Sequence, residues 1–305
     1  MTSPPRLFDR DLVAWRLDRA IGAPTPGADF LLARAAEELA DRLMLVKRDF
    51  LDAADVGTPG PHGYLALAAR SGARSTQRLA PTAASAALIA APGAVADLES
   101  PGLAPHSLDL VVSLQALHLV NDLPGALIQL RQALRPDGLL IAALAGGDTL
   151  TELRQALTIA ESETTGGVSP RIAPFADVRA MGGLLQRAGL ALPVVDADRA
   201  TVRYDNIFAL MRDLRAFGAG NPLDARLRIP TRRAVFLRAE EVYRERFSDP
   251  DGRLRATFDT LWISGWAPHD SQQKPMKPGS ARMRLADALK STSNDDGGTS
   301  ESFQS

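Results

Sequence analysis

The sequence predicts an α/β fold in which helices cover both faces of a mainly parallel β-sheet. Two observations lead to this prediction. Short apolar runs typical of strands buried on both faces recur along the chain, for example at 108–113 and 139–144. Between such runs lie segments with apolar residues spaced by three or four, which indicates amphipathic helices. Strands that alternate with helices in this way form parallel sheets with helices on both sides.

The elements can be placed along the chain from this periodicity and from the turn residues. The predicted helices are 28–47, 64–70, 122–134, one that begins at about Thr149, 174–188, and an entirely helical segment at 205–248. The predicted strands are 50–56, 108–113, 139–144, segments within 192–204, and 255–266. Thr149 and Glu152 have the spacing of a capping box, in which hydroxyl and carboxylate each accept from a free amide at the helix start.

This order of elements predicts three parts of the chain. Residues 1–27 form an N-terminal arm, and residues 28–268 form one domain with a helical insertion at 205–250, before the last strand. The tail, 269–305, ends in a segment rich in Ser, Thr, Asn and Gly that we expect to be disordered.

Composition excludes several classes of function. The 305 residues carry a net charge of −1, which does not favour nucleic acid as a partner. There is no Cys, and the four His are scattered, so disulfides are excluded and no metal site is expected. No apolar run reaches the roughly 18 residues of a spanning helix. We expect a cytoplasmic protein without a transmembrane segment, and we leave peripheral membrane association open.

A first candidate site follows the strand at 50–56. In open α/β sheets, ligands bind beyond the carboxyl ends of the strands. Asp55, Gly57, Gly60 and Gly63 therefore form a candidate cofactor-binding loop. A flexible strand-to-helix loop would explain these residues equally well. A dinucleotide fold also needs an acid roughly 20 residues further on, and the segment 75–81 has none, which argues against NAD.

Other candidates follow the later strands. Asp97 and Glu99 could approach a base or ribose, or could simply lie in an exposed loop. Ser113 ends a central strand and should line the crevice, and His118 beyond it could act as a base or be a packed, hydrogen-bonded histidine. Asp148, in the turn after 139–144, could face the site, whereas a helix cap alone would explain Thr149 and Glu152.

Several longer motifs resemble a known family. Leu108-Asp-Leu-Val-Val-Ser113 and Leu134-Arg-Pro-Asp-Gly138 resemble the middle motifs of class I S-adenosylmethionine (SAM) methyltransferases. Gly146-Gly-Asp-Thr-Leu-Thr-Glu-Leu-Arg154 and the opening Phe8-Asp9-Arg10 resemble mitochondrial complex I assembly factor 5 and its bacterial relatives. Similar segments continue to His269-Asp-Ser-Gln272, so the resemblance covers about residues 7–290.

The resemblance implies a Rossmann-like class I methyltransferase fold with a seven-stranded sheet and SAM as the cofactor, bound by Asp55, Gly57, Gly60, Gly63, Asp97 and Ser113. It also implies action on a subunit of respiratory complex I, by methylation or by arginine hydroxylation, with Asp148, His118 and Glu152 as the catalytic candidates. A close cousin within the fold methylates malonyl groups on acyl carrier protein, which is the alternative activity.

The cofactor loop departs from the family pattern. The loop at 57–63 is two residues longer than the family's and contains Pro59 and Pro61, which cannot donate amide hydrogen bonds. Leu79 stands where the family has an acid for the ribose. Three hypotheses therefore remain: a SAM-dependent methyltransferase, a protein arginine hydroxylase, or a non-catalytic assembly factor with an eroded SAM site.

Overall fold

The computed structural model describes residues 6–70 and 73–273. The described residues up to His269 belong to one compact unit, which contains the fold and the candidate site. The predicted tail, 269–305, lies outside the described residues from residue 274 onward, and this part includes the end that we expect to be disordered.

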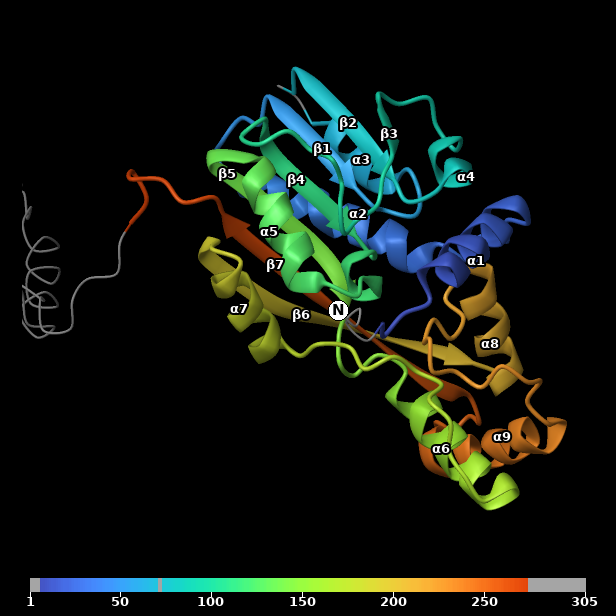
Figure 1. Ribbon diagram of the computed structural model, residues 1–305. Helices are drawn as coiled ribbons and strands as arrows, with labels where there is room; N and C mark the ends of the chain where they lie inside the picture. Colours follow the sequence, from blue (N-terminus) through green and yellow to red (C-terminus); the bar gives the residue numbers. More distant parts are fainter. Residues whose placement is uncertain (1–5, 71–72, 274–305) are drawn as a thin grey trace, which may run out of the picture. The chain divides into compact units, whose positions relative to one another are not determined.

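Seven strands of the described residues form one sheet, in the order β3-β2-β1-β4-β5-β7-β6 (Figure 1). The strands are β1 (Asp52–Val56), β2 (Ser75–Ala80), β3 (Gly93–Val95), β4 (Leu108–Leu114), β5 (Leu134–Ala145), β6 (Ala191–Tyr204) and β7 (Leu254–Trp266). The pairs from β3 to β5 are parallel, whereas β7 runs antiparallel to both β5 and β6. The prediction of a mainly parallel seven-stranded sheet is confirmed.

The helices follow the alternation that the sequence indicates. They are α1 (Arg10–Gly22), α2 (Phe30–Met44), α3 (His62–Ala68), α4 (Ala83–Ala86), α5 (Leu123–Ala133), α6 (Thr151–Thr165), α7 (Val178–Arg187), α8 (Ile207–Ala216) and α9 (Arg233–Phe247), with a 3-10 turn at Leu117–Leu119. Asp122 and Asp177 cap α5 and α7 by accepting from backbone amides, so local sequence fixes these two starts.

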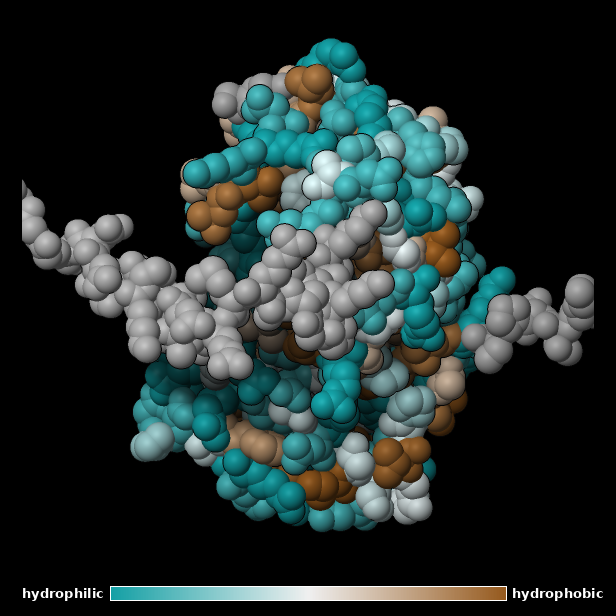
Figure 2. Space-filling model, turned by 90° about the vertical axis from the view of Figure 1, so that its left-hand side faces the viewer, coloured by the Kyte–Doolittle hydropathy of each residue, from teal (hydrophilic) through white to brown (hydrophobic). Residues whose placement is uncertain are grey.

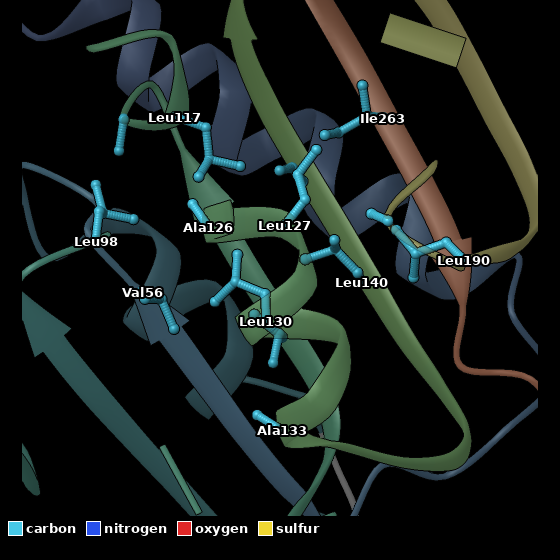
Figure 3. Packing of buried hydrophobic residues seen from close by; sticks show 14 of the residues in the cluster. Val56, Leu98, Leu117, Ala126, Leu127, Leu130, Ala133, Leu140, Leu190 and Ile263 are labelled. Carbon is cyan, nitrogen blue, oxygen red and sulfur yellow. The ribbon is translucent and has the colours of Figure 1, made fainter. Parts of the chain in front are cut away.

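Two cores lie on the two faces of the sheet. On one face, α5 buries Leu127 and Leu130 against β-strand residues such as Leu140 and Ile263 (Figure 3). Leu185 of α7 belongs to the same cluster. On the other face, α2 and α3 pack on the opposite side chains of the same strands, which form a second cluster. Because both faces are covered, the central strands are apolar on both sides, which is the pattern that revealed them.

A third core stabilises the region that follows β5. Helices α6, α8 and α9 pack together against the amino-terminal half of β7, around Leu153, Val242, Tyr243 and Phe258. In Figure 1 these helices lie around the right-hand end of the antiparallel strands β6 and β7. Helices therefore do lie between the last two strands, but 217–232 contains no helix, and the prediction of a wholly helical 205–248 is wrong. Gly218 and Gly220, with Pro222 and Pro230, disfavour helix there.

The predicted capping box at the start of α6 is also wrong. Leu150 occupies the N-cap position in a left-handed conformation, and no side chain caps the helix. The Thr149 hydroxyl instead donates to the carbonyl of Asp259 and accepts from its amide, at 2.9 and 3.0 Å. The Glu152 carboxylate accepts from the amide and hydroxyl of Thr257. Both side chains therefore attach α6 to β7 rather than to its own first turn.

The face of the molecule seen in Figure 2 is largely hydrophilic, with hydrophobic residues in separate patches. Within the described part of the chain, no helix combines the length and the apolar character needed to cross a membrane.

Candidate functional site

A cavity of about 920 Å³ lies beyond the carboxyl ends of β4 and β5, where open α/β sheets bind ligands. Its volume is in the range of small-molecule sites. The walls come from distant parts of the chain: α1, α6, α8, the turns after β4 and β5, and β7. Helices α1 and α8 contact each other and form the side of the cavity away from the sheet.

The polar side chains at the sheet end of this cavity include Gln115, His118 and Asp259, together with Thr149 and Thr260. The Nδ1 atom of His118 accepts from the amide of Ala145 at 3.3 Å, and its ring packs edge-on against Phe175 at 5.5 Å. A neutral His118 with Nδ1 as acceptor carries its proton on Nε2. The described residues offer Nε2 no hydrogen-bond partner, so it is available to a ligand.

Burial lowers the pKa of His118 to about 4, from an ordinary value of 6.5. Its accessible surface faces the cavity rather than bulk water. At neutral pH the imidazole is therefore uncharged, and it can accept or relay a proton but cannot act as a standing cation.

Asp259 is the carboxylate that lines the cavity, and it is only 7% exposed. Its Oδ1 atom is buried without a hydrogen-bond partner, although the Nε of Arg199 lies 3.6 Å away. A side chain at Gly146 would come within 2.7 Å of Asp259 Oδ2, so the glycine makes room for this carboxylate. A buried carboxylate with an unsatisfied oxygen is costly and marks a site for a donor or a cation.

The other two predicted catalytic residues do not line the cavity. Asp148 is exposed and forms an ion pair with Arg199, which also approaches Asp259. Glu152 is buried and bonds Thr257, two residues before Asp259 on β7. Both residues therefore act on the surroundings of Asp259 and not on the cavity itself. Among residues 6–70 and 73–273, no cluster of His, Asp or Glu is arranged to hold a metal ion.

The predicted cofactor residues at the end of β1 form a closed network. Asp55 is fully buried and accepts from the hydroxyl of Thr58 and from the amide of Tyr64 at 3.0 Å. Burial raises its pKa to about 7. Gly63 lies so close that a Cβ there would stand 2.6 Å from Asp55 Oδ1. Asp55 and Gly63 therefore shape the loop from within.

Arg78 of β2 occupies the other side of this loop. Its buried guanidinium donates to the carbonyls of Gly60 and Ser85, at 2.9 and 2.6 Å. Gly57 has a φ of +78°, and a Cβ there would clash with Leu98 at 2.5 Å. The loop is thus covered by the chain's own side chains, and none of Asp55, Gly57, Gly60 and Gly63 lines the large cavity.

The last two predicted cofactor residues come from other segments that border this loop: Leu98, next to Asp97, packs against Gly57, and the amide of Leu114, next to Ser113, donates to the Thr58 hydroxyl. Asp97 forms an ion pair with Arg10 at 2.5 Å, in the segment that precedes and begins α1. Ser113 is fully buried in β4, and its hydroxyl has no hydrogen-bond partner among the described residues. The six predicted cofactor residues thus belong to three segments that meet at this loop.

These residues do not fit SAM in the manner of the family. The position for ribose recognition is Leu79, only 6% exposed, and next to it stands Arg78, whose guanidinium fills the loop. Asp97 is already paired with Arg10. Because the usual acceptors for the ribose hydroxyls are absent or engaged, no catalytic step through SAM is derived from this geometry.

The sheet order, with an antiparallel β7 between β5 and β6, defines the class I methyltransferase fold. Residues 55–142 match the family model described as a methyltransferase domain. A putative methyltransferase structure from Bacillus halodurans C-125 aligns with a TM-score of 0.53 at 12% identity, over 76% of this chain and 98% of that one. At this identity the likeness shows the fold alone.

The chain belongs to the family of the arginine-hydroxylase NDUFAF5. It is 38% identical to the mitochondrial protein of that name from Danio rerio over 293 residues, which cover 93% of this chain and 90% of the relative. The Homo sapiens protein is 38% identical over 304 residues, covering 94% and 85%. A malonyl-[acyl-carrier protein] O-methyltransferase from Methylovorus sp. is 34% identical over 306 residues, covering 95% and 96%. The resemblance seen in the sequence motifs is confirmed.

Sequence reasoning missed Asp259 and Gln115 as candidate residues. Asp259 did leave a signal, because it is the one acid in the run 256–263 of a predicted strand, in which the other residues are apolar or Thr. Gln115 follows a central strand and has a φ of 52°, a backbone feature that the residue type does not reveal.

Proposed function

We propose that this protein binds an arginine side chain of a polypeptide subunit and modifies it during assembly of respiratory complex I (NADH:quinone oxidoreductase). The observation that carries the proposal is Asp259, a residue that lines the cavity and whose buried carboxylate has one oxygen without a hydrogen-bond partner. A guanidinium is planar and offers several donors, and it pairs with a carboxylate through two hydrogen bonds. The similarity to proteins named arginine-hydroxylase supports the same substrate class.

Each predicted catalytic residue has a role in this proposal. His118, uncharged and beside the same end of the cavity, presents its Nε2–H as a donor to an oxygen of the bound polypeptide, because the guanidinium itself has no acceptor. Glu152 is a positioning residue, because it fixes Thr257 and hence the register of Asp259. Asp148 forms an ion pair with Arg199, and the guanidinium of Arg199 also lies near Asp259. Arg199 therefore partly balances the negative charge of Asp259 before the substrate guanidinium binds.

A cytoplasmic location, with peripheral attachment at the inner membrane where complex I assembles, is part of the proposal. Its support is the absence of a candidate spanning helix from the described residues. Fractionation of the source cells tests it: we expect the protein in the supernatant or in a salt-washed membrane extract, and recovery only with detergent would contradict it.

The test of the function is deletion of the gene followed by mass spectrometry of complex I subunits. We expect an arginine that carries one extra oxygen atom in wild-type cells to be unmodified in the deletion strain. Asp259→Asn should fail to restore the modification, whereas Asp251→Asn, a matched change at an exposed turn next to β7, should restore it. If Asp259→Asn restores both modification and assembly, the proposed role of Asp259 is wrong. Assembly restored without any modification would identify a non-catalytic assembly factor.

A second candidate function is methyl transfer to an acyl group on a carrier protein. Its support is the full-length similarity to the malonyl-[acyl-carrier protein] O-methyltransferase and the several arginines that line the cavity, which suit an anionic substrate. An added methylene group instead of an oxygen atom on the product would favour this candidate. The closed loop around Arg78 argues against it.

A further inference from the structure

We propose that the side of the cavity between α1 and α8 binds an anionic amphiphile, a ligand with an aliphatic chain and a carboxylate or phosphate head. This proposal depends on the cavity walls and not on the arginine-modifying function. Arg16 and Arg19 of α1 and Arg212 and Arg215 of α8 all line the same cavity. We call these four residues the arginine rim.

The members of the arginine rim have no carboxylate partner among the described residues, although they line one cavity. The fifth arginine that lines the cavity, Arg171, differs from them because it forms an ion pair with Glu161 at 2.6 Å. By contrast, the guanidinium of Arg19 lies over the ring of Trp15, and that of Arg16 donates to the carbonyl of Asn221. A bound anion would supply the charged partner that the described residues do not give to these guanidinium groups.

Arg16 gives the clearest signal within the rim. Loss of hydration on burial, with a smaller contribution from the neighbouring Arg226, lowers its pKa below the ordinary value. Its ordered hydrogen-bond partner is a neutral carbonyl oxygen, which does not balance the charge. A partly desolvated guanidinium in this state binds carboxylates and phosphates well, because its planar donors match their oxygens.

The wall next to the rim is apolar and comes from five elements that meet only in the folded chain. The residues are Leu31, Leu153, Leu157, Met211, Phe236 and Phe258. Deep apolar walls with charged groups at one side provide the burial that an aliphatic chain needs and a counter-charge for its head.

An acidic polypeptide segment is the competing occupant. It would satisfy the arginine rim, but its backbone amides and carbonyls would lose water against the apolar wall without gaining partners. The apolar wall therefore favours the amphiphile. A place in the last turn of a helix explains Arg215 on α8 and Arg19 on α1, but it does not explain Arg16 and Arg212.

The experiment uses the full chain after removal of bound lipid, with the fluorescent fatty acid cis-parinaric acid as the probe. We expect saturable binding, displaced by oleate at a concentration about tenfold lower than by oleyl alcohol, which has the same chain without the charge. Lysophosphatidate is compared with oleate to distinguish a phospholipid-type head from a free fatty acid. A polyglutamate peptide is the third competitor.

Two variants and one control test the assignment to this cavity. Arg212→Glu with Arg215→Glu should weaken oleate binding about tenfold or more. Arg233→Glu with Arg246→Glu makes the same charge change on exposed positions of α9 outside the cavity and should leave binding unchanged. Met211→Trp, which fills part of the apolar wall, should weaken binding without altering the charge, and it serves if the charge variant does not fold.

Three results would overturn the proposal. They are no saturable binding of the probe, equal displacement by oleate and oleyl alcohol, or unchanged binding in both cavity variants. Displacement by polyglutamate but not by oleate would instead identify an acidic polypeptide as the occupant. None of these results depends on whether the arginine modification is found.

Discussion

At the residue scale, buried polar groups separate the two halves of the site. On the β1 side, the carboxylate of Asp55 and the hydroxyl of Thr58 satisfy each other, and the Thr58 hydroxyl also accepts from the amide of Leu114 at 3.0 Å. On the β7 side, the carboxylate of Asp259 keeps an unsatisfied oxygen, whereas the unpartnered groups near β1 are the Nε of Arg78 and the hydroxyl of Ser113. Because orphaned buried groups are costly, they persist where a ligand is expected to complete them.

The Thr58 hydroxyl should be a large contributor to stability. Thr58→Val removes a donor to Asp55 and an acceptor for Leu114, and it leaves both partners buried. We expect the free energy of unfolding to fall by about 2–3 kcal/mol, from loss of buried hydrogen bonds. Urea unfolding monitored by circular dichroism measures this change. Thr201→Val, at an exposed position of β6, is the control and should be close to neutral. Equal effects of the two substitutions would show that the network around Asp55 contributes little.

His118 should titrate far below an ordinary histidine. Because burial lowers its pKa in the folded state to about 4, from 6.5, the unfolded chain binds more protons in between. The contribution of His118 to stability is therefore present above pH 6.5 and is lost as the pH falls towards 4. Proton NMR of the imidazole should show no titration of His118 between pH 6 and 8, and His118→Phe should remove part of the acid-side loss of stability. A midpoint near 6.5 would contradict the burial seen here.

At the scale of elements, the position of α1 decides the shape of the cavity. The segment before this helix is held by Asn121, whose Oδ1 accepts from the amides of Leu7 and Phe8, both at 2.8 Å. Asp9 pairs with Arg226 at 2.9 Å, and Arg10 pairs with Asp97. The family's opening Phe-Asp-Arg motif is therefore a structural attachment of α1 in this chain.

Asn121→Ala should loosen α1 without unfolding the domain. The loss of its contacts to Leu7 and Phe8 should speed amide hydrogen exchange over residues 7–22 by about tenfold or more, while exchange in α7 stays unchanged. Asn121→Asp keeps an acceptor for both amides and is the matched control. Since Arg16 and Arg19 lie on α1, Asn121→Ala should also weaken binding of cis-parinaric acid. Unchanged exchange over 7–22 would mean that the pairs of Asp9 and Arg10 suffice to hold the helix.

The central strands could be predicted from sequence because each is a local apolar run, such as 108–113 within β4. The predicted strands did not include β2, which begins with polar residues, or β3, which is only 3 residues long. The start of α6 could not, because Thr149 and Glu152 have the spacing of a cap but bond to residues more than 100 positions away. A local pattern cannot distinguish a helix cap from a contact to a distant strand. The arginine rim could not be predicted for the same reason. In the sequence its members resemble ordinary surface residues of two separate helices, and only the fold places α1 and α8 around one cavity.

At the scale of the whole molecule, the loop after β1 is filled by the chain's own side chains, whereas an open cavity lies beyond β4 and β5. The changed loop and the missing acid at Leu79 were visible in the sequence, but Arg78 as the occupant of the loop was not, since its partners Gly60 and Ser85 lie in separate segments. Asp97, a candidate for binding the ribose or base, forms an ion pair with Arg10, and the sequence did not reveal this pair because the two residues also lie in separate segments. The sequence therefore located the loop, and only the fold shows what fills it.

The closed loop predicts that SAM does not bind this protein in the usual way. Calorimetric titration of the cofactor-free chain should give no heat of binding up to millimolar SAM, which corresponds to a binding free energy weaker than about −4 kcal/mol. The Methylovorus sp. relative, purified in the same way, is the positive control. Millimolar SAM should likewise leave the unfolding temperature of this chain unchanged, because a ligand stabilises only the state that it binds. Micromolar binding would show that the loop around Arg78 opens for the cofactor, and it would make methyl transfer the leading function.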